Sequence, residues 1–165
     1  MVLGILAEIV QRWLGPTERV VADAATFIAT RVDPETAEAR SIEVPDSLGV
    51  LTRMAGGVRA TYRLSTVVHA PRDANGISVY GSGATLHWSL DDTMTFARAG
   101  EEPRPLEPDP GTEGSWRVER DFIDSIREHK PVELTNFEDG LRYMQFIEAV
   151  WRSWSEQRTV DVASI

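Results

Sequence analysis

The sequence contains no cysteine among its 165 residues. Disulfide bonds, thiolate metal sites and a cysteine nucleophile are therefore excluded, and a reducing cytoplasm is the compartment that this composition fits. Clusters of positive charge are also lacking along the chain, because 26 acidic residues outnumber 17 lysines and arginines. Such an acidic balance repels phosphate backbones and anionic lipids, so we expect neither nucleic acid nor a membrane surface as a partner.

The first 15 residues are apolar, but they do not have the pattern of a membrane span or a secretory leader. They carry Glu8 and Arg12 and lack both a basic leader and a small-residue cleavage site. Apolar residues recur here at helical spacing, and Gly15-Pro16 supplies a helix stop, so we predict a helix. No capping residue precedes it, and from this we expect the natural chain to begin further upstream.

With 42% hydrophobic residues in 165, residues 1–165 are expected to form a single domain. Residues 19–32 are rich in β-branched side chains and predict one long strand, followed by an exposed loop over residues 33–45. Two further β-type runs flank Gly56-Gly57, which predicts a hairpin with a tight primed turn because both glycines tolerate positive φ. In its second strand, odd-numbered residues share one face and even-numbered residues share the other.

The middle of the chain then continues as an antiparallel meander, with predicted strands at residues 77–81, 84–90 and 93–99. A proline-rich surface connection over residues 100–114 separates these strands from a helix at residues 116–128. Strands in the middle and helices at both ends predict an α+β fold, in which helices pack on one face of an open, largely antiparallel sheet.

The last long helix is predicted to open with a capping box formed by Thr135 and Glu138, and a short strand over residues 159–162 follows it. Two tryptophans three residues apart on this helix could stack on a ligand, but we expect burial in the core or in an interface. The apolar stripe assigned to the helix core consists of Leu141, Met144, Ile147, Val150, Trp151 and Trp154.

Three histidines, His69, His87 and His129, are far apart in the sequence and do not have the spacing of a zinc-binding motif, so no metal site is expected. His87 is interpreted as a sheet-surface residue and His129 as the end of a helix, where a cation is favourable. His69 shares the predicted strand face of Arg63 and Ser65, so these three could face a substrate. A solvent face or a subunit contact is the alternative.

Other residues that suggest chemistry have simpler structural interpretations. Ser82 lies between two predicted strands rather than on the sharp strand-to-helix turn of a hydrolase nucleophile. Gly81 and Gly83 lack the third glycine and the βαβ setting of a nucleotide cradle. Adjacent acids at Asp91-Asp92 are expected to form a solvated turn rather than a cation site. No catalytic residue is assigned in this chain.

Three stretches, in this order and spacing, resemble the Gfo/Idh/MocA family of glucose-fructose and inositol oxidoreductases: DSLGVLTRMAGGVRATYRLS, ISVYGSGATLHW and the final DFIDSIREHKPVELTNFEDGLRYMQFIEAVWRSWSEQRTVDV. The resemblance extends from about Leu6 to Val162. It implies a C-terminal domain that contributes to a substrate pocket and to subunit contacts, beside an N-terminal Rossmann domain that holds NAD or NADP.

The family's glycine-rich Rossmann turn and its Glu-Lys-Pro motif are absent from this sequence. The first helix also lacks the aspartate and histidine that the resemblance would place there. We therefore expect no cofactor in this chain, no catalysis by the chain alone, and a sugar, polyol or related small molecule as the substrate of the parent enzyme. A free-standing binding or scaffold protein of the same fold is the alternative, and a hydrolase ranks third because no nucleophile and base are visible together.

A sheet covered by helices on one side leaves the other face exposed, and a large apolar patch is uncommon on a soluble monomer. We therefore predict a homo-oligomer formed through the open face of the sheet. The residues expected on or near this face are Thr61, Val67, Val79, Leu86, Trp88 and Phe96.

Overall fold

The computed structural model describes residues 2–69, 75–111, 114, 117–132 and 134–165. These residues group into two compact units: the first contains Met1–Val68 and Glu128–Ile165, and the second contains His69–Arg127. Helices and open antiparallel sheets make up the fold, so the expected α+β class is confirmed. No helix in the described part of the chain is long and apolar enough to cross a membrane.

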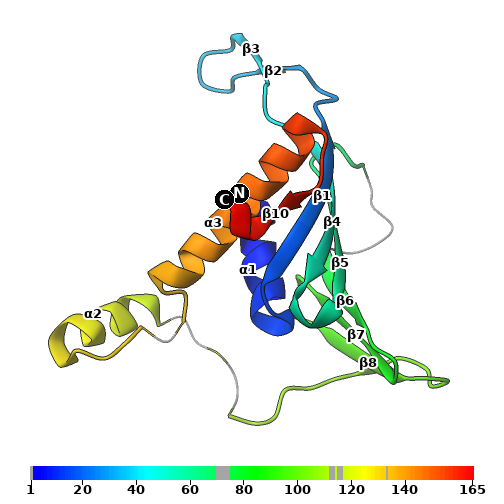
Figure 1. The fold of residues 1–165 in the computed structure, drawn as a ribbon, viewed down its shortest axis with the longest axis vertical. Coiled ribbons are helices and arrows are strands. Elements are labelled where there is room, and N and C mark those ends of the chain that lie inside the picture. Colours follow the sequence, from blue (N-terminus) through cyan, green and yellow to red (C-terminus); the bar gives the residue numbers. More distant parts are fainter. Residues whose placement is uncertain (1, 70–74, 112–113, 115–116, 133) are drawn as a thin grey trace. The chain divides into compact units, whose positions relative to one another are not determined.

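The first unit is built on a four-stranded sheet in the order β10-β1-β4-β5. All neighbouring strands in this sheet are antiparallel. Figure 1 shows α3 crossing one face of the sheet beside β1, with α1 next to it. The strands are β1 (Thr17–Ala25), β4 (Ser47–Met54), β5 (Arg59–Ser65) and β10 (Val160–Asp161), and the helices are α1 (Val2–Leu14) and α3 (Phe137–Glu156).

The core of the first unit lies between this sheet and its two helices. Val20 and Val50 are almost completely buried from the sheet side, as is Phe146 from α3. The Phe146 ring packs on that of Tyr62, with 5.4 Å between the ring centroids. Ala7 of α1 is also fully buried, which lets α1 approach α3 closely. The even-numbered residues of β5 therefore face the helices, as the alternation predicts.

The prediction of one long strand over residues 19–32 is wrong, because β1 ends at Ala25 and β2 (Thr30–Val32) is a separate strand. The interruption has a specific cause in the Asp46 side chain, which is buried. Its two carboxylate oxygens accept hydrogen bonds from the backbone amides of Phe27 and Ile28, at 2.9 and 2.8 Å. These bonds turn the chain away from the sheet, and they lower the pKa of the Asp46 carboxyl.

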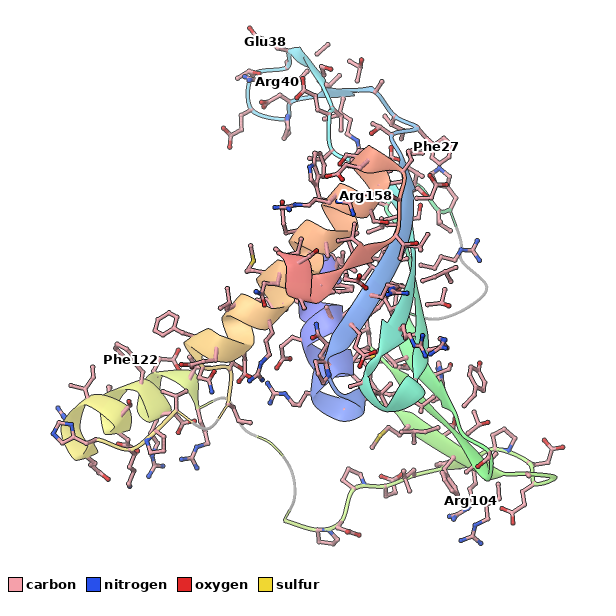
Figure 2. All side chains as sticks on the ribbon, in the orientation of Figure 1. Phe27, Glu38, Arg40, Arg104, Phe122 and Arg158 are labelled. Atoms are coloured by element: carbon pink, nitrogen blue, oxygen red, sulfur yellow. The ribbon has the colours of Figure 1, made fainter. Side chains whose placement is uncertain are left out.

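We expected residues 33–45 to form a loop throughout. They instead contain β3 (Ala39–Ser41), which pairs with β2 in a two-stranded ribbon. The turn between them is held by Asp33, whose carboxylate accepts the amide of Glu35 at 2.9 Å. Arg40 forms an ion pair with Asp33 at 3.0 Å. Figure 2 shows Arg40 and Glu38 on this ribbon, all of whose strand residues are exposed.

The hairpin between β4 and β5 is confirmed, but its turn is not the two-residue primed turn that we predicted. Three residues, Ala55–Gly57, form a short 3₁₀ turn (η1), closed by a bond from the Met54 amide to the Val58 carbonyl at 2.9 Å. Gly56 and Gly57 have φ values of +72° and +85°. Both glycines are therefore required for the reason expected, although the loop is one residue longer.

The helix ends follow local signals closely. Gly15, with φ of +90°, ends α1 and donates its amide to the Gln11 carbonyl at 2.9 Å. The predicted capping box at Thr135 and Glu138 is displaced by one residue. Asn136 is the N-cap of α3 and accepts the Asp139 amide at 2.9 Å, because its short amide side chain lies nearer to the first turn.

The core face of α3 differs from the predicted stripe. Leu141, Met144 and Trp151 are exposed, whereas the buried residues of the helix are Phe146, Ala149, Val150 and Ser153. Small residues at positions 149 and 153 let the helix lie close to the sheet, so the helix presents this face rather than the bulkier one. Trp151 and Trp154 stack edge to face, with centroids 5.0 Å apart, at the border of the core.

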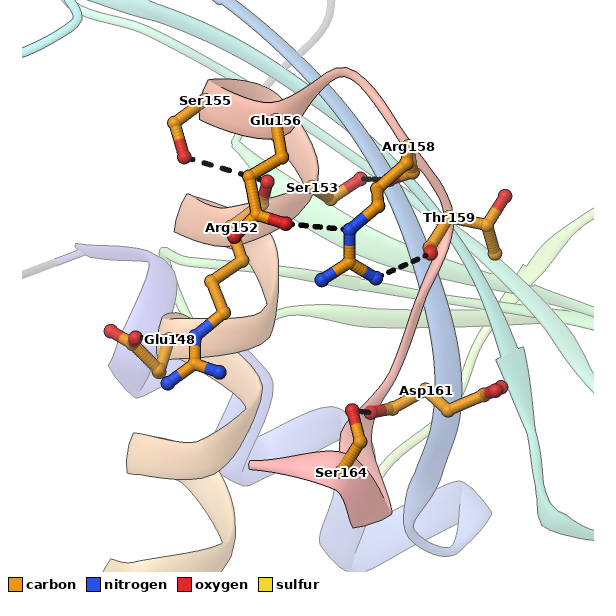
Figure 3. Close-up of polar contacts among 9 residues, drawn as sticks. All are labelled: Glu148, Arg152, Ser153, Ser155, Glu156, Arg158, Thr159, Asp161 and Ser164. Carbon is orange, nitrogen blue, oxygen red and sulfur yellow. Dashed lines mark hydrogen bonds and ion pairs between the residues drawn. The ribbon is translucent and has the colours of Figure 1, made fainter.

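Ser153 links the C-terminal end of α3 to the sheet. Its hydroxyl donates to the Arg158 carbonyl at 2.6 Å and accepts the Ala22 amide of β1 at 3.0 Å. Figure 3 shows the first of these bonds beside the Arg158–Glu156 ion pair. Gln157 adopts the left-handed conformation and ends the helix, after which β10 and a 3₁₀ turn (η2, Val162–Ser164) close the chain.

The second unit contains a four-stranded antiparallel sheet in the order β6-β7-β8-β9. This is the predicted meander, extended by one short strand. The strands are β6 (Gly76–Tyr80), β7 (Ala84–Ser89), β8 (Met94–Arg98) and β9 (Arg104–Pro105). The predicted helix is α2 (Val118–Glu128), whose apolar side includes Phe122, an exposed residue labelled in Figure 2.

Candidate functional site

The face of the first sheet opposite the helices is the candidate functional surface. Because directly paired residues point to the same side of a sheet, the register defines this open face residue by residue. The open face comprises Arg19, Val21, Asp23 and Ala25 of β1, Ser47, Gly49, Leu51 and Arg53 of β4, Arg59, Thr61, Arg63 and Ser65 of β5, and Asp161 of β10.

The centre of the open face is apolar. Val21 pairs with Leu51, which pairs with Thr61 on the next strand. The exposed fractions of Val21 and Leu51 are 45% and 59%. Val21 and Leu51 are therefore neighbouring exposed aliphatic side chains, and arginines lie beside them on the same face.

One side of this centre carries a row of arginines. Arg19, Arg53 and Arg59 are direct cross-strand neighbours in the register. At the β10 end of the row, Arg19 forms an ion pair with Asp161 at 2.6 Å. The hydrogen bond and the charge of Asp161 raise the pKa of Arg19. Arg59 folds back on its own turn and donates to the Gly57 carbonyl at 2.9 Å.

The predicted substrate-facing residues are placed differently from one another. Arg63 and Ser65 lie on the open face of β5 and are exposed. The strand ends at Ser65, whose hydroxyl accepts the Val67 amide at 3.3 Å. His69 comes four residues later and belongs to the second unit, so the strand alternation that suggested the trio does not extend to it. The substrate-facing role of these three residues stays a prediction.

The other histidines occupy separate positions. His87 lies on β7, and its Nδ1 is 2.9 Å from the Ser78 hydroxyl of β6. His129 follows α2 with a positive φ of 54°. Within the described residues, no three histidine or carboxylate side chains are grouped so that they could hold a metal ion.

The turns of the second sheet have the structural roles expected for them. Ser82 lies in the β6–β7 hairpin, where the Gly81 amide bonds to the Ala84 carbonyl at 2.9 Å. Asp91 accepts the Thr93 hydroxyl at 2.8 Å, and this bond is the main cause of the lowered pKa of the Asp91 carboxyl. These residues therefore stabilise tight turns, and their geometry does not resemble that of a nucleophile.

The first unit holds a pocket of about 210 Å³ between α1 and the start of α3. Its walls include two ion pairs, Arg12 with Glu8 on α1 and Arg142 with Asp139 on α3, the latter at 3.0 Å. Gln11 also lines it, and the Nε2 atom of this side chain is buried with no hydrogen-bond partner among the described residues.

Sequence reasoning missed the arginine row and this pocket, for different reasons. Arg53 and Arg59 lie at equal separations from the centre of the Ala55–Gly57 turn, so the hairpin pattern alone could have paired them. The pocket joins residues more than a hundred positions apart, and no local pattern connects Arg12 with Arg142.

Comparison with known proteins gives a family and a fold. The sequence profile of an oxidoreductase family's C-terminal alpha/beta domain, that of the Gfo/Idh/MocA proteins, matches residues 6–162. Among curated protein sequences, none matches the chain.

Solved structures with this fold are about twice the length of the chain. A levoglucosan dehydrogenase in complex with NADH is 19% identical, with a TM-score of 0.78 over 98% of this chain and 49% of that one. An NAD binding oxidoreductase from Klebsiella pneumoniae is 20% identical, with a TM-score of 0.77 over 97% and 49%. An aldose-aldose oxidoreductase from Caulobacter crescentus complexed with glycerol is 22% identical, with a TM-score of 0.72 over 96% and 45%.

Proposed function

The chain belongs to the Gfo/Idh/MocA oxidoreductase family, in the part that forms the C-terminal α/β domain, and from this premise we propose that it is the substrate-binding and oligomerisation half of an NAD(P)-dependent oxidoreductase. The observation that carries the proposal is the family match over residues 6–162. The chain spans about half of the NAD-binding enzymes that share its fold, which leaves room in such enzymes for a separate nucleotide-binding domain.

The cofactor of the parent enzyme, NAD or NADP, is assigned to that separate domain. All strand pairs in the described residues are antiparallel, whereas a Rossmann cradle needs neighbouring parallel strands joined by a helix. The chain alone is therefore expected to be inactive. When the chain is mixed with NAD or NADP and a panel of sugars and polyols, no reduced nicotinamide should form; turnover by the pure chain would refute the division of roles.

The proposed substrates are sugars, polyols or related small molecules, and a cytoplasmic location is part of the same proposal. Structures of this fold include levoglucosan dehydrogenase complexes with levoglucosan and with L-sorbose. Arg63, Ser65 and His69 are proposed to face such a substrate, because a planar guanidinium can bridge two hydroxyl groups or a carboxylate.

Oligomerisation is proposed to occur through the open face of the first sheet. In the second unit, the partly exposed apolar residues of the second sheet are proposed to form a contact of their own. In support, Val79 pairs with Leu86 and Leu86 with Phe96, so these three share one face of the second sheet. A contact of roughly 1,500 Å² would be sufficient for a stable homodimer once association costs are subtracted. Leu51 lies at the centre of the first contact and is exposed in the single chain.

Sedimentation velocity over a tenfold concentration range tests this contact. The wild-type chain should sediment as a dimer or larger assembly, and Leu51→Lys should shift it to the monomer because the new charge lies among arginines. Val32→Lys is the matched control, since Val32 is an exposed aliphatic residue on the β2–β3 ribbon, away from the open face, and it should leave the assembly intact. A monomeric wild type at every concentration would contradict the proposal.

A free-standing binding protein is the second candidate. It is favoured by the pocket between α1 and α3, which the chain's own residues form without help from another domain. The two candidates differ in one measurable respect. Binding of a sugar or polyol that depends on Arg142 but gains nothing from any nucleotide-binding partner would favour the second candidate over the first.

A further inference from the structure

The arginine row of the open face, formed by Arg19, Arg53 and Arg59, is balanced by its own chain at one end only. Arg53 is the direct cross-strand neighbour of both other arginines. Like charges at this spacing, about 5 Å between Cβ atoms, are destabilising. Asp161 pairs with Arg19, and Arg59 donates to backbone carbonyls of its own turn. Arg53, at the centre of the row, forms no ion pair within the described residues.

The open face also carries an acid, on the other side of its apolar centre. Asp23 is exposed, and in the described part of the chain it forms no ion pair. Its cross-strand neighbour is Gly49, where a Cβ would meet no atom within 4 Å. The glycine therefore leaves a notch in the face beside the Asp23 carboxylate, and a long side chain from a second copy can enter it.

The symmetry of a contact between two identical faces limits which residues can meet. Such copies are related by a twofold axis in the plane of the contact, and if the strands of the two sheets are aligned, the axis runs either along the strands or across them. An axis along the strands stacks the arginine row of one copy on that of the other. An axis across the strands, through the row of Val21, Leu51 and Thr61, exchanges the two sides instead. Arg53 and Gly49 lie two residues from Leu51 in opposite directions, so this axis superimposes one on the other.

We propose that the open-face dimer, on which this inference rests, is built about the axis across the strands, so that Arg53 of each copy enters the notch at Gly49 of the partner subunit and pairs with the partner's Asp23. The partner's Asp23 is the cross-strand neighbour of that notch, about 5 Å away, which is within reach of an arginine lying over the glycine. The pair forms twice, once on each side of the axis. The same axis brings Arg59 near the partner's Arg63 on edge strand β5, at the rim of the contact, where charges remain in solvent.

Charge reversal tests the pairing, with sedimentation equilibrium of the full chain as the assay. Asp23→Arg should raise the dissociation constant of the dimer at least about tenfold, because Arg53 then meets another arginine across the contact. Adding Arg53→Asp in the same chain restores the pair with its charges exchanged, so the double variant should dimerise within about threefold of the wild type. Glu43→Arg is the control. It makes the same change of charge at an exposed position between β3 and β4 and should leave the dimer unchanged.

Cross-linking reports the direction of the axis independently, because the chain has no cysteine of its own. Thr61 lies on the proposed axis, so the thiols introduced by Thr61→Cys should face each other and be joined by a short bismaleimide. Ser65→Cys is the control on the same strand, four residues further along. The proposed axis places its two copies roughly 27 Å apart along the strands, twice four residues at about 3.4 Å each, so they should not be joined.

The arrangement is overturned if Asp23→Arg dimerises as the wild type does, if the double variant does not recover, or if Ser65→Cys is cross-linked as well as Thr61→Cys. The open-face contact itself is tested separately by Leu51→Lys. If that variant dissociates the dimer and Asp23→Arg does not, the contact stands and only the proposed arrangement falls.

Discussion

Ser153 gives the sharpest test of how the fold of the first unit is held together. Its hydroxyl joins α3, β1 and the segment before β10, and 1% of the residue is exposed. Ser153→Ala removes a bond of 2.6 Å to the Arg158 carbonyl and a bond of 3.0 Å from the Ala22 amide. The Ala22 amide lies beyond the end of the β1–β10 pairing, so no strand can replace the lost acceptor.

The expected loss in the free energy of unfolding is about 2–3 kcal/mol, because two hydrogen bonds are lost and two backbone groups are left poorly satisfied. For a chain of this length, that corresponds to a fall of roughly 4–12 °C in melting temperature. Thermal and urea unfolding followed by circular dichroism measure the loss, and hydrogen exchange at the Ala22 amide should accelerate.

Ser155→Ala is the matched control, since Ser155 lies on the same helix, is exposed and makes only a 3.4 Å bond to the Arg152 carbonyl (Figure 3). A surface change of this kind should alter stability by less than about 0.5 kcal/mol. If Ser153→Ala is as mild as Ser155→Ala, or if exchange at Ala22 does not change, the link between helix and sheet does not have the role argued for it.

Two further predictions concern one residue in each unit. The Tyr62 hydroxyl is buried without a partner among the described residues, and burial raises the pKa of Tyr62 to about 12, so Tyr62→Phe should be neutral or stabilising at neutral pH. Above pH 10 the Tyr62 hydroxyl ionises in the unfolded state before it does so in the folded state, so the free energy of unfolding of the wild type should fall as pH rises toward 12. The free energy of unfolding of Tyr62→Phe should fall less. Equal falls for the two proteins in urea unfolding would refute this. In the second unit, a Cβ at Gly76 would lie 2.3 Å from the Trp88 carbonyl, so Gly76→Ala should weaken β6–β7 pairing in hydrogen exchange. Gly83→Ala, which meets open space, should not weaken this pairing, and equal effects of the two changes would contradict the clash.

Local patterns in the sequence predicted the elements whose causes are local. Gly15 ends the first helix, Gly56 and Gly57 form the β4–β5 turn, and the alternation of β5 places Arg63 on the open face. In each case the determining residue lies within a few positions of the structure it specifies. The family resemblance supplied the domain type, which none of these patterns could give.

The errors arose where a distant residue decides the local structure. The strand that was expected to continue to residue 32 stops at Ala25, because the Asp46 side chain, about twenty positions later, captures the next free amides. The core face of α3 is likewise set by close approach to the sheet through Ala149 and Ser153 rather than by its bulkiest stripe. Periodicity identifies that a helix is amphipathic, but the packing partner determines which face is buried.

The central claim is that this chain is the substrate and oligomerisation half of an oxidoreductase whose nucleotide-binding half is a separate domain. Titration calorimetry of the isolated chain with NADH and with NADPH tests this claim most directly. We predict no saturable heat of binding with either nucleotide. To bind the phosphates of such a ligand, a protein needs a glycine-rich turn at a helix N-terminus in a parallel βαβ unit. Micromolar binding of either nucleotide to the isolated chain would contradict the assignment.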